Sequence, residues 1–334
     1  MRNTSRLFTV LAIAGVIILL LILVPRILQT PAPALPHSYT AYLKENGQPP
    51  LQHVFVIVME NSSYNGLLGN PDAPWINQAA RTYALATNYY GVAHPSQPNY
   101  LALTSGSIQG VRSDETITVD APNLVDQLEA HGHSWKAYMQ SLFAQGNTDK
   151  LVPQAGDYVR KHDPFVSYAD IQHNPARMAN IVDFSQFAID LHANTVPDFA
   201  WISPDLCHDM HGRAAQQPGD PCADSQLLVR QGDAFLHTIV DEIMHSPAWN
   251  ENSVIFLTWD ESESNDGSGC CDASRGGGHI LTLIIAHNQK APHSSHVLYN
   301  HYSLLATIED AWGLGCLANT CDTTNVHPMT DLLP

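Results

Sequence analysis

Positively charged residues are scarce in this sequence. Lys and Arg together number 15, against 32 Asp and Glu, and the formal net charge is −17. Binding to a nucleic-acid backbone depends on clustered Lys and Arg, so no nucleic-acid partner is expected. A small phosphorylated substrate is still compatible with an acidic surface, because one bound divalent cation can reverse the field at a single site.

Low-complexity segments and internal repeats are also missing. The chain has 334 residues, of which 44% are hydrophobic. This length can bury a substantial core in one large domain, or in one domain with insertions. Disorder is therefore not expected for the main part of the chain.

None of the six cysteines lies in a C-x-x-C pattern, so the sequence gives no sign of a zinc ribbon or a redox motif. Cys207 and Cys222 flank a polar loop, and Cys316 and Cys321 bracket a short turn. In an oxidising compartment both pairs are expected to be loop-closing disulfides. The adjacent Cys270–Cys271 either form a vicinal bridge or pair elsewhere, and the sequence leaves both alternatives open.

One long uncharged run, Leu7–Val24, follows Arg2 and Arg6 near the N-terminus. As a helix it would be roughly 27 Å long, enough to cross a hydrocarbon core. Cleaved signal peptides usually have a shorter apolar region of about 7–15 residues. An uncleaved signal anchor is therefore favoured over a signal peptide for residues 1–29. Either alternative exports the rest of the chain, which is anchored to the membrane facing outward or else secreted.

After an extended linker at residues 30–50, strand and helix patterns alternate through residues 51–334. Short apolar runs typical of buried parallel strands are followed by polar loops and helical periodicity. Strands are predicted at His53–Met59, Ser134–Tyr138, Phe199–Ser203, Ser253–Trp259 and Ile280–Ala286. Helices are predicted at Asn123–His131, Asp224–Met244 and Tyr302–Trp312. This alternation predicts an α/β/α sandwich around a mostly parallel sheet.

Acidic or amide residues directly follow three of the predicted strands, and ligands bind at the carboxyl ends of strands in such sheets. The residues are Glu60 and Asn61, Asp205, and Asp260 and Glu261. Carboxylates gathered without a cation would raise one another's pKa. We therefore expect Glu60, Asn61, Asp260 and Glu261 to bind a divalent cation, either Ca²⁺, Mg²⁺, Mn²⁺ or Zn²⁺. The alternative is that these acids only cap helices or face solvent.

Ser96 is the candidate nucleophile. It lies between two prolines and before an apolar helical stretch within Gly91–Gly106, so it is expected at a helix N-terminus. Free N–H groups there stabilise phosphate. The alternative is a simple helix-cap role. His94 is a second candidate, as nucleophile or proton donor.

Further histidines are candidates for the same site. His208 and His211 follow the Phe199–Ser203 strand, His279 opens the Ile280–Ala286 strand, and His301 opens the last predicted helix. Imidazoles near acidic strand ends suit a second metal or a proton donor to the leaving group. Any single histidine is more often structural than catalytic.

Five motifs together resemble the phosphoesterase family that contains bacterial acid phosphatases and phospholipases C, within the alkaline-phosphatase-like group. They are Met59–Tyr64 (MENSSY), His94–Gly106 (HPSQPNYLALTSG), Trp259–Glu263 (WDESE), Gly277–Ile280 (GGHI) and Asn300–Leu314 (NHYSLLATIEDAWGL). Within that family the sequence most resembles the short secreted acid phosphatases, including the type that acts on phosphoinositides. The resemblance implies that Ser96 is the nucleophile and that Glu60, Asn61, Asp260 and Glu261 bind metal. It also implies that Asn99, His279 and His301 line the phosphate pocket; His208 and His211 carry over less directly.

The expected function is metal-dependent hydrolysis of phosphomonoesters, with a small phosphorylated molecule or a phospholipid head group as substrate. A phospholipase C-like phosphodiesterase would use the same residues and differ only in accepting a second ester group. The third alternative is a non-catalytic exported protein that keeps the metal for structure. Nothing in the sequence indicates an oligomeric state.

Overall fold

The computed structural model describes residues 50–250, 252–263, 265–271, 276–289 and 291–334. The predicted anchor at 1–29 and nearly all of the linker at 30–50 lie outside these residues. Contacts divide the chain into two units, Met1–Ala34 and Leu35–Pro334, and the fold below is that of the second. Within the described residues, no helix combines the length and the apolar character needed to span a membrane.

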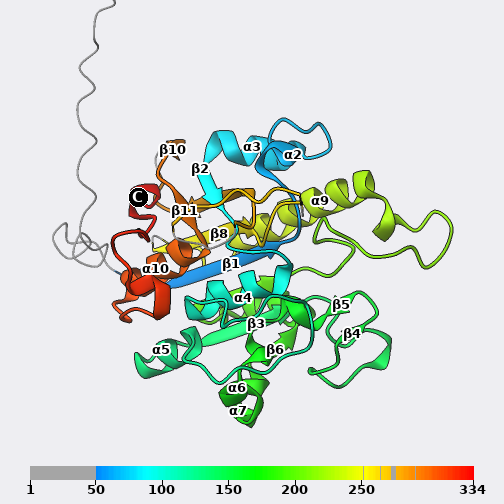
Figure 1. The fold of residues 1–334 in the computed structure, drawn as a ribbon, viewed down its shortest axis with the longest axis horizontal. Helices are drawn as coiled ribbons and strands as arrows, with labels where there is room; N and C mark the ends of the chain where they lie inside the picture. The colour runs from blue at the N-terminus through cyan, green and yellow to red at the C-terminus, as the bar shows by residue number, and fades with distance from the viewer. Residues whose placement is uncertain (1–49, 251, 264, 272–275, 290) are drawn as a thin grey trace, which may run out of the picture. The chain divides into compact units, whose positions relative to one another are not determined.

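One mixed sheet forms the centre of the second unit (Figure 1). Its strands are β1 (His53–Met59), β2 (Ala84–Tyr90), β3 (Trp135–Met139), β6 (Ile181–Asp183), β7 (Phe199–Ser203), β8 (Ser253–Trp259), β9 (His279–Ala286), β10 (His293–Ser295) and β11 (Tyr299–Asn300). Their order is β10-β2-β9-β8-β1-β7-β3-β6, with β11 also paired to β2. All pairings are parallel except those of β9 with β2 and β8. The predicted mostly parallel sheet is confirmed.

The central strands are apolar along both faces. Every residue of β7 and β8 is buried, and so is every residue of β1 after His53. In the register of these strands, Ile57 is paired with Ile202 on one side and with Leu257 on the other. A strand buried on both faces needs cover on both sides of the sheet, which is why these runs lack polar alternation. The predicted first and last residues of β1, β7 and β8 are those observed.

The helices pack in two groups, one containing α4 with α10 and the other containing α9 with α3 and α8. The α-helices are α2 (Tyr64–Leu67), α3 (Pro74–Thr82), α4 (Ser96–Ser105), α5 (Leu124–Ala130), α6 (Ala169–Gln172), α7 (Pro175–Ala179), α8 (Ser185–Ala193), α9 (Ser225–Met244) and α10 (His301–Trp312). The predicted helices correspond to α5, α9 and α10. Asn123 caps α5, and the side chain of Asp224 caps α9 by accepting hydrogen bonds from two backbone N–H groups.

Several elements carry no clear pattern in the sequence. β2 contains Thr87 and Asn88, and its register with β9 shifts between Ala86 and Tyr89. A bulge of this kind interrupts the alternation that marks a strand. A separate two-stranded sheet, β4 (Gln154–Ala155) with β5 (Tyr158–Val159), is too short to leave a periodic signal.

All six cysteines are paired. The predicted bridges Cys207–Cys222 and Cys316–Cys321 are confirmed. Cys270 and Cys271 are bonded to each other, so the vicinal alternative is the one adopted. No thiol is left to bind zinc.

Candidate active site

Three strand ends meet at one edge of the sheet, as predicted. The loop after β7 is hydrogen-bonded to the end of β1, because the backbone N–H of Glu60 donates to the carbonyl of Asp209 (2.9 Å). The N–H of Asp260 donates to the carbonyl of Met59 (2.9 Å), and the N–H of Asn61 donates to Oδ1 of Asp260 (3.0 Å). Asn61 has a φ of 45°, a conformation that Asn tolerates better than most residues. The two acidic pairs, two hundred residues apart in sequence, are therefore in contact.

Ser96 is the first residue of α4 and is buried. Its hydroxyl lies 3.1 Å from Oε2 of Glu60 and 3.1 Å from Oε1 of Glu261, and it can donate to either carboxylate. Nδ2 of Asn61 approaches the same oxygen at 3.4 Å. The predicted position at a helix start is confirmed. The structure also brings this serine together with three of the four predicted metal-binding residues.

The helix start offers fewer free N–H groups than the sequence suggested. The N–H of Gln97 donates to Oδ1 of Asp114 (3.0 Å), and Pro98 has no N–H to give. Asp114 comes from the loop between α4 and α5. The first turn of α4 is therefore partly occupied by a carboxylate of the chain itself.

Glu60 lies at the centre of the site and is fully buried. The hydroxyl of Tyr100 donates to Oε1 (2.6 Å), and Nδ2 of Asn61 donates to Oε2 (2.9 Å). Burial by itself would raise the pKa of Glu60, but His162, His211 and Lys161 bring it well below the ordinary value. Glu60 is thus an ionised carboxylate inside the protein.

The pKa values of the neighbouring acids are shifted in the opposite direction. Burial, followed by the negative charge of Glu60, raises the pKa of Asp260 well above its ordinary value and that of Asp209 to about 8. Burial likewise raises the pKa of Glu261, although His94 opposes it. Among the described residues, Oδ2 of Asp260 and Oδ2 of Asp209 have no hydrogen-bond partner. The site therefore holds more buried carboxyl groups than its own side chains can keep in the ionised form.

The donor set fits a divalent cation, because hard cations prefer carboxylate and amide oxygens and because the unpartnered Oδ2 of Asp260 is available. The carboxylates do not yet form a tight cage. In the described part of the chain, three ligand atoms of His, Cys, Asp or Glu lie within 4.8 Å of one another only at Asp157, Cys207 and Cys222. The disulfide there removes both thiolates. Glu60, Asp260 and Glu261 would have to draw closer together around an ion.

His94 and His301 hold the acidic pairs rather than contacting Ser96. Nδ1 of His94 contacts Oε2 of Glu261, and Nε2 donates to the carbonyl of Asp266 (2.8 Å). His301 is buried at the start of α10; Nε2 donates to the carbonyl of Asp260 (2.5 Å). Burial lowers the pKa of His301 to about 4. Its imidazole is therefore neutral and fixes the backbone at Asp260.

Of the four predicted substrate-binding residues, only His211 reaches the acidic pairs. Its Nδ1 lies 3.3 Å from Nδ2 of Asn61 and 3.6 Å from Oε2 of Glu60, with nearly half of the side chain exposed. His208 instead pairs with Asp205, at 2.8 Å.

Asn99 and His279 are occupied elsewhere. The amide of Asn99 accepts from the N–H groups of Val92 and Ala93 and donates to the carbonyl of Ala93, which fixes the loop before Ser96. The ring of His279 stacks between Tyr64 and Tyr90, with centroids 4.4 and 5.1 Å away.

Four site residues were not identified from the sequence: Tyr100, Lys161, His162 and Asp209. Tyr100 follows Ser96 by four residues, a spacing that places both on one helix face, so this signal was available. His162 lies 3.2 Å from Oε1 of Glu60, and Lys161 contacts the Ser96 hydroxyl. Both come from the short 3₁₀ turn Arg160–His162, which has no recognisable motif.

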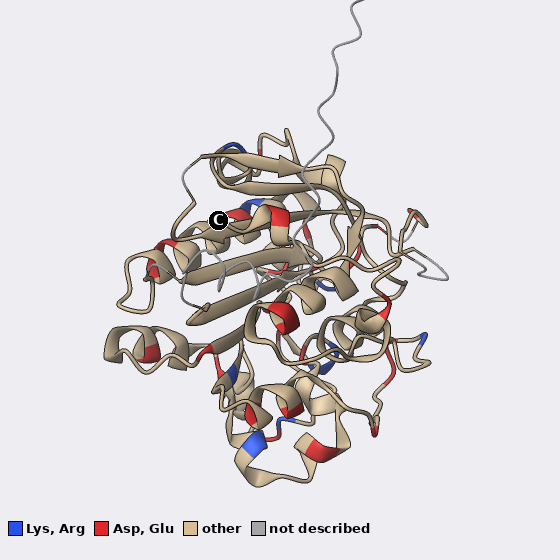
Figure 2. Ribbon diagram, turned by 90° about the vertical axis from the view of Figure 1, so that its left-hand side faces the viewer, with Lys and Arg blue, Asp and Glu red and all other residues tan. Residues whose placement is uncertain are grey.

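Acidic residues outnumber basic ones across the whole ribbon (Figure 2), which makes the few cations near the site more significant. Lys161 is one of them. Burial disfavours its charge, but Glu60 and Asp114 raise its pKa, and it is an ammonium at neutral pH.

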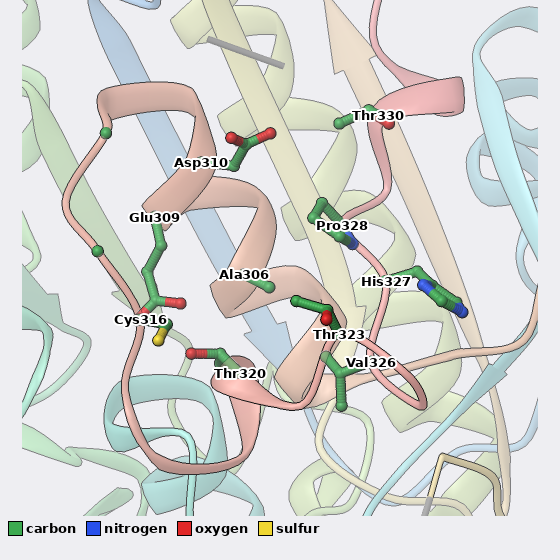
Figure 3. A pocket seen from close by; sticks show the side chains of 12 residues that line it. Ala306, Glu309, Asp310, Cys316, Thr320, Thr323, Val326, His327, Pro328 and Thr330 are labelled. Atoms are coloured by element: carbon green, nitrogen blue, oxygen red, sulfur yellow. The ribbon is translucent and has the colours of Figure 1, made fainter. Parts of the chain in front are cut away.

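Two cavities differ in their relation to the site. A recess of about 280 Å³ is lined by Gln97, which follows Ser96 in the chain, and by Asp114, Arg160 and Lys161, among others. A larger cavity of about 550 Å³ lies at the C-terminal half of α10 and is lined by residues such as Glu309, Thr320 and His327 (Figure 3). None of its lining residues belongs to the acidic site.

A family model matches most of the chain. The model of the phosphoesterase family matches residues 70–315, which is more than half of the chain. The chain belongs to the phosphoesterase family. The resemblance suggested by the five motifs is confirmed.

Curated proteins with similar sequences include two kinds of phosphatase. The phosphatidylinositol-3-phosphatase of Mycobacterium tuberculosis is 30% identical over 99% of this chain and 96% of its own length. A probable acid phosphatase of Kluyveromyces lactis is also 30% identical, over 81% of this chain. The chain spans only 61% of that yeast protein and 55% of an Aspergillus fumigatus acid phosphatase.

Solved structures confirm the fold class. A Vibrio parahaemolyticus protein of the alkaline phosphatase superfamily aligns with a TM-score of 0.51 at 15% identity, over 81% of this chain and 68% of that one. The lipoteichoic acid synthase LtaP of Listeria monocytogenes gives 0.52 at 12% identity, over 84% and 74%. The predicted alkaline-phosphatase-like α/β fold is confirmed.

Proposed function

We propose that this protein hydrolyses phosphomonoesters, with Ser96 as the nucleophile. The observation that carries the proposal is the Ser96 hydroxyl, which lies 3.1 Å from each of two buried carboxylates at the start of a helix. A serine so placed has a proton acceptor within hydrogen-bond reach, as nucleophilic catalysis requires. Membership of the phosphoesterase family supports the same chemistry.

Glu60, Asn61, Asp260 and Glu261 are proposed to hold a divalent cation. When bound, it would neutralise the excess carboxylate charge and stabilise charge on the reacting oxygens. Mg²⁺, Ca²⁺, Mn²⁺ and Zn²⁺ all accept oxygen ligands of this kind. His301 and the backbone bonds between strand ends would keep the ligands in place.

The chain's own residues account for the proton movements. As the bond between Ser96 Oγ and phosphorus forms, the serine proton passes to a neighbouring carboxylate of Glu60 or Glu261. The bond from phosphorus to the alcohol oxygen breaks, and His211 at the exposed side of the site protonates that oxygen. Water then attacks the phosphoserine and gives one proton to His211, the P–Oγ bond breaks, and Ser96 recovers its proton from the carboxylate that had taken it. The net reaction consumes one water and releases an alcohol and inorganic phosphate.

Small phosphorylated alcohols, including phosphoinositide head groups, are the proposed substrates. The name of the mycobacterial relative, which matches this chain over almost its full length, supports this class. The apolar run Leu7–Val24 would export the domain and hold it at the outward-facing surface of the membrane. If this segment is cleaved, the domain would be released. The substrate class and the location of the domain can both be measured directly.

The nucleophile is tested with Ser96→Ala on metal-saturated protein and p-nitrophenyl phosphate. Turnover is expected to fall by about a thousandfold or more, and the phosphoryl adduct seen by mass spectrometry of the acid-quenched wild type should disappear. Ser105→Ala is the matched control, because Ser105 is a buried serine at the other end of α4. Full turnover by Ser96→Ala would remove the nucleophile assignment.

A further inference from the structure

Lys161 is the one Lys or Arg side chain that contacts the acidic site among the residues that the structure describes. Its Nζ lies 3.2 Å from Oγ of Ser96 and 2.7 Å from Oδ2 of Asp114. The side chain is 18% exposed, so the ammonium is held inside the protein rather than extended into solvent. It reaches the nucleophile from the turn Arg160–His162, which packs against α4.

Hydrogen-bond capacity defines what Lys161 can still do. An ammonium has three N–H donors and no acceptor. One N–H points to Asp114 and one to Ser96 Oγ, which leaves a third for a group bound over the serine. When a phosphorus atom approaches Oγ to reacting distance, about 3–3.5 Å, its non-bridging oxygens come within reach of the same Nζ.

The first turn of α4 supplies fewer N–H donors to a phosphoryl group than a helix start usually does. The N–H of Gln97 is already donated to Asp114, and Pro98 has none. The carboxylates of Glu60 and Glu261 each lie 3.1 Å from the Ser96 hydroxyl, and negative charge there would repel a dianion. A fixed positive charge that touches the nucleophile directly offsets that repulsion.

We propose that Lys161 is a catalytic residue that binds the non-bridging oxygens of a dianionic phosphoryl group over Ser96, and that Asp114 is its positioning residue. The inference rests on the proposed phosphatase function and deepens it by naming the charge of the preferred substrate. Lys161 keeps its protons throughout the reaction. Because its attraction is Coulombic, it favours phosphomonoester dianions over phosphodiester monoanions.

A competing explanation is that Lys161 only balances the acidic cluster. In that case its removal would alter metal affinity or stability, and it would slow all substrates equally. The discriminating quantity is therefore the ratio of kcat/KM for a monoester to kcat/KM for a diester, measured at saturating metal. p-Nitrophenyl phosphate and methyl p-nitrophenyl phosphate share one leaving group and differ in charge.

The experiment compares Lys161→Met, Lys161→Arg and Asp114→Asn with wild type. Lys161→Met is expected to lower kcat/KM for the monoester by about 100-fold and for the diester by less than about 10-fold, so the ratio falls at least about tenfold. Lys161→Arg should keep part of the ratio, and Asp114→Asn should lower it modestly. Lys136→Met is the matched control: Lys136 is a partly buried lysine paired with Asp190 at 2.6 Å, and neither residue belongs to the acidic site.

Calorimetric binding of orthovanadate provides a readout that does not need turnover. Lys161→Met should weaken it at least about tenfold while the dissociation constant for the metal stays unchanged or decreases. Either an unchanged ratio or unchanged orthovanadate binding at saturating metal would overturn the inference. If wild type turns over neither ester, the proposed function fails, and orthovanadate affinity alone then decides whether Lys161 binds the anion.

Discussion

At the scale of single residues, buried carboxyl groups in this protein have contrasting environments. Glu60 receives hydrogen bonds from Tyr100 and Asn61, and its pKa is lowered by His162, His211 and Lys161. Glu309, on α10, lines the larger cavity together with residues such as Thr320 and His327 (Figure 3). Gln127 donates to its Oε1 (3.1 Å), and Oε2 has no partner among the described residues. Burial raises the pKa of Glu309 to about 7.

This shift makes stability depend on pH. Because the folded pKa lies above the ordinary value of 4.5, folded protein holds the Glu309 proton between about pH 4.5 and 7 while unfolded protein releases it. The contribution of Glu309 to folding stability is therefore most favourable at acid pH and falls as pH rises, by about 3 kcal/mol at most. Glu309→Gln should match wild type near pH 5 and become the more stable protein by pH 8, as measured by urea unfolding.

The control for that measurement is Glu242→Gln, on the exposed face of α9, which should follow the wild-type profile. A difference between Glu309→Gln and wild type that is the same at every pH would contradict the assignment of the titration to Glu309.

At the scale of elements, the site depends on how closely β2 approaches the neighbouring strand ends. Gly91 follows β2, and its N–H donates to the carbonyl of Gly278 (3.0 Å). A Cβ at this position would lie 2.9 Å from the carbonyl oxygens of Asp260 and Gly277. Both are backbone atoms, so neither can move aside without shifting the strand end that carries the acidic pair.

Gly91→Ala is therefore expected to destabilise the protein by about 1–3 kcal/mol and to lower phosphatase turnover. Gly267→Ala is the matched control, since a Cβ there meets nothing within 4 Å; its effect should stay within about 0.5 kcal/mol. Thermal unfolding and p-nitrophenyl phosphate hydrolysis measure the two effects. Wild-type behaviour of Gly91→Ala would mean that the strand end is not held as described.

At the scale of the whole molecule, the net charge of −17 and the buried carboxylates point to a protein stabilised by a bound cation. Because an ion that binds only the folded state stabilises it by mass action, an ion at 100 times its dissociation constant contributes about 2.7 kcal/mol. Removal of divalent metal should therefore lower Tm as well as turnover.

The measurement is thermal unfolding with EDTA and after return of Mg²⁺, Ca²⁺, Mn²⁺ or Zn²⁺ in turn. Asp260→Asn should lose the metal-dependent part of the Tm shift, whereas Asp241→Asn, on the exposed surface of α9, should keep it. Unchanged Tm and turnover in protein shown by elemental analysis to be metal-free would exclude the proposed ion.

The sequence by itself determined the central strands β1, β7 and β8, the helices α9 and α10, and the meeting of Glu60 with Asp260. Hydrophobic periodicity is a local property, and parallel strands necessarily place their carboxyl ends at one edge. The position of Ser96 at a helix start also followed from its flanking prolines.

Only the tertiary structure decided which polar side chains surround that serine. Lys161 and His162 reach the site from a short turn, and Asp209 from an irregular loop, so no periodic signal marks them. Asn99 and His279, predicted beside the phosphate, are engaged by a backbone loop and by two tyrosine rings. The physical reason is that loop paths depend on contacts between residues far apart in sequence, whereas strand and helix patterns are written within a few consecutive residues.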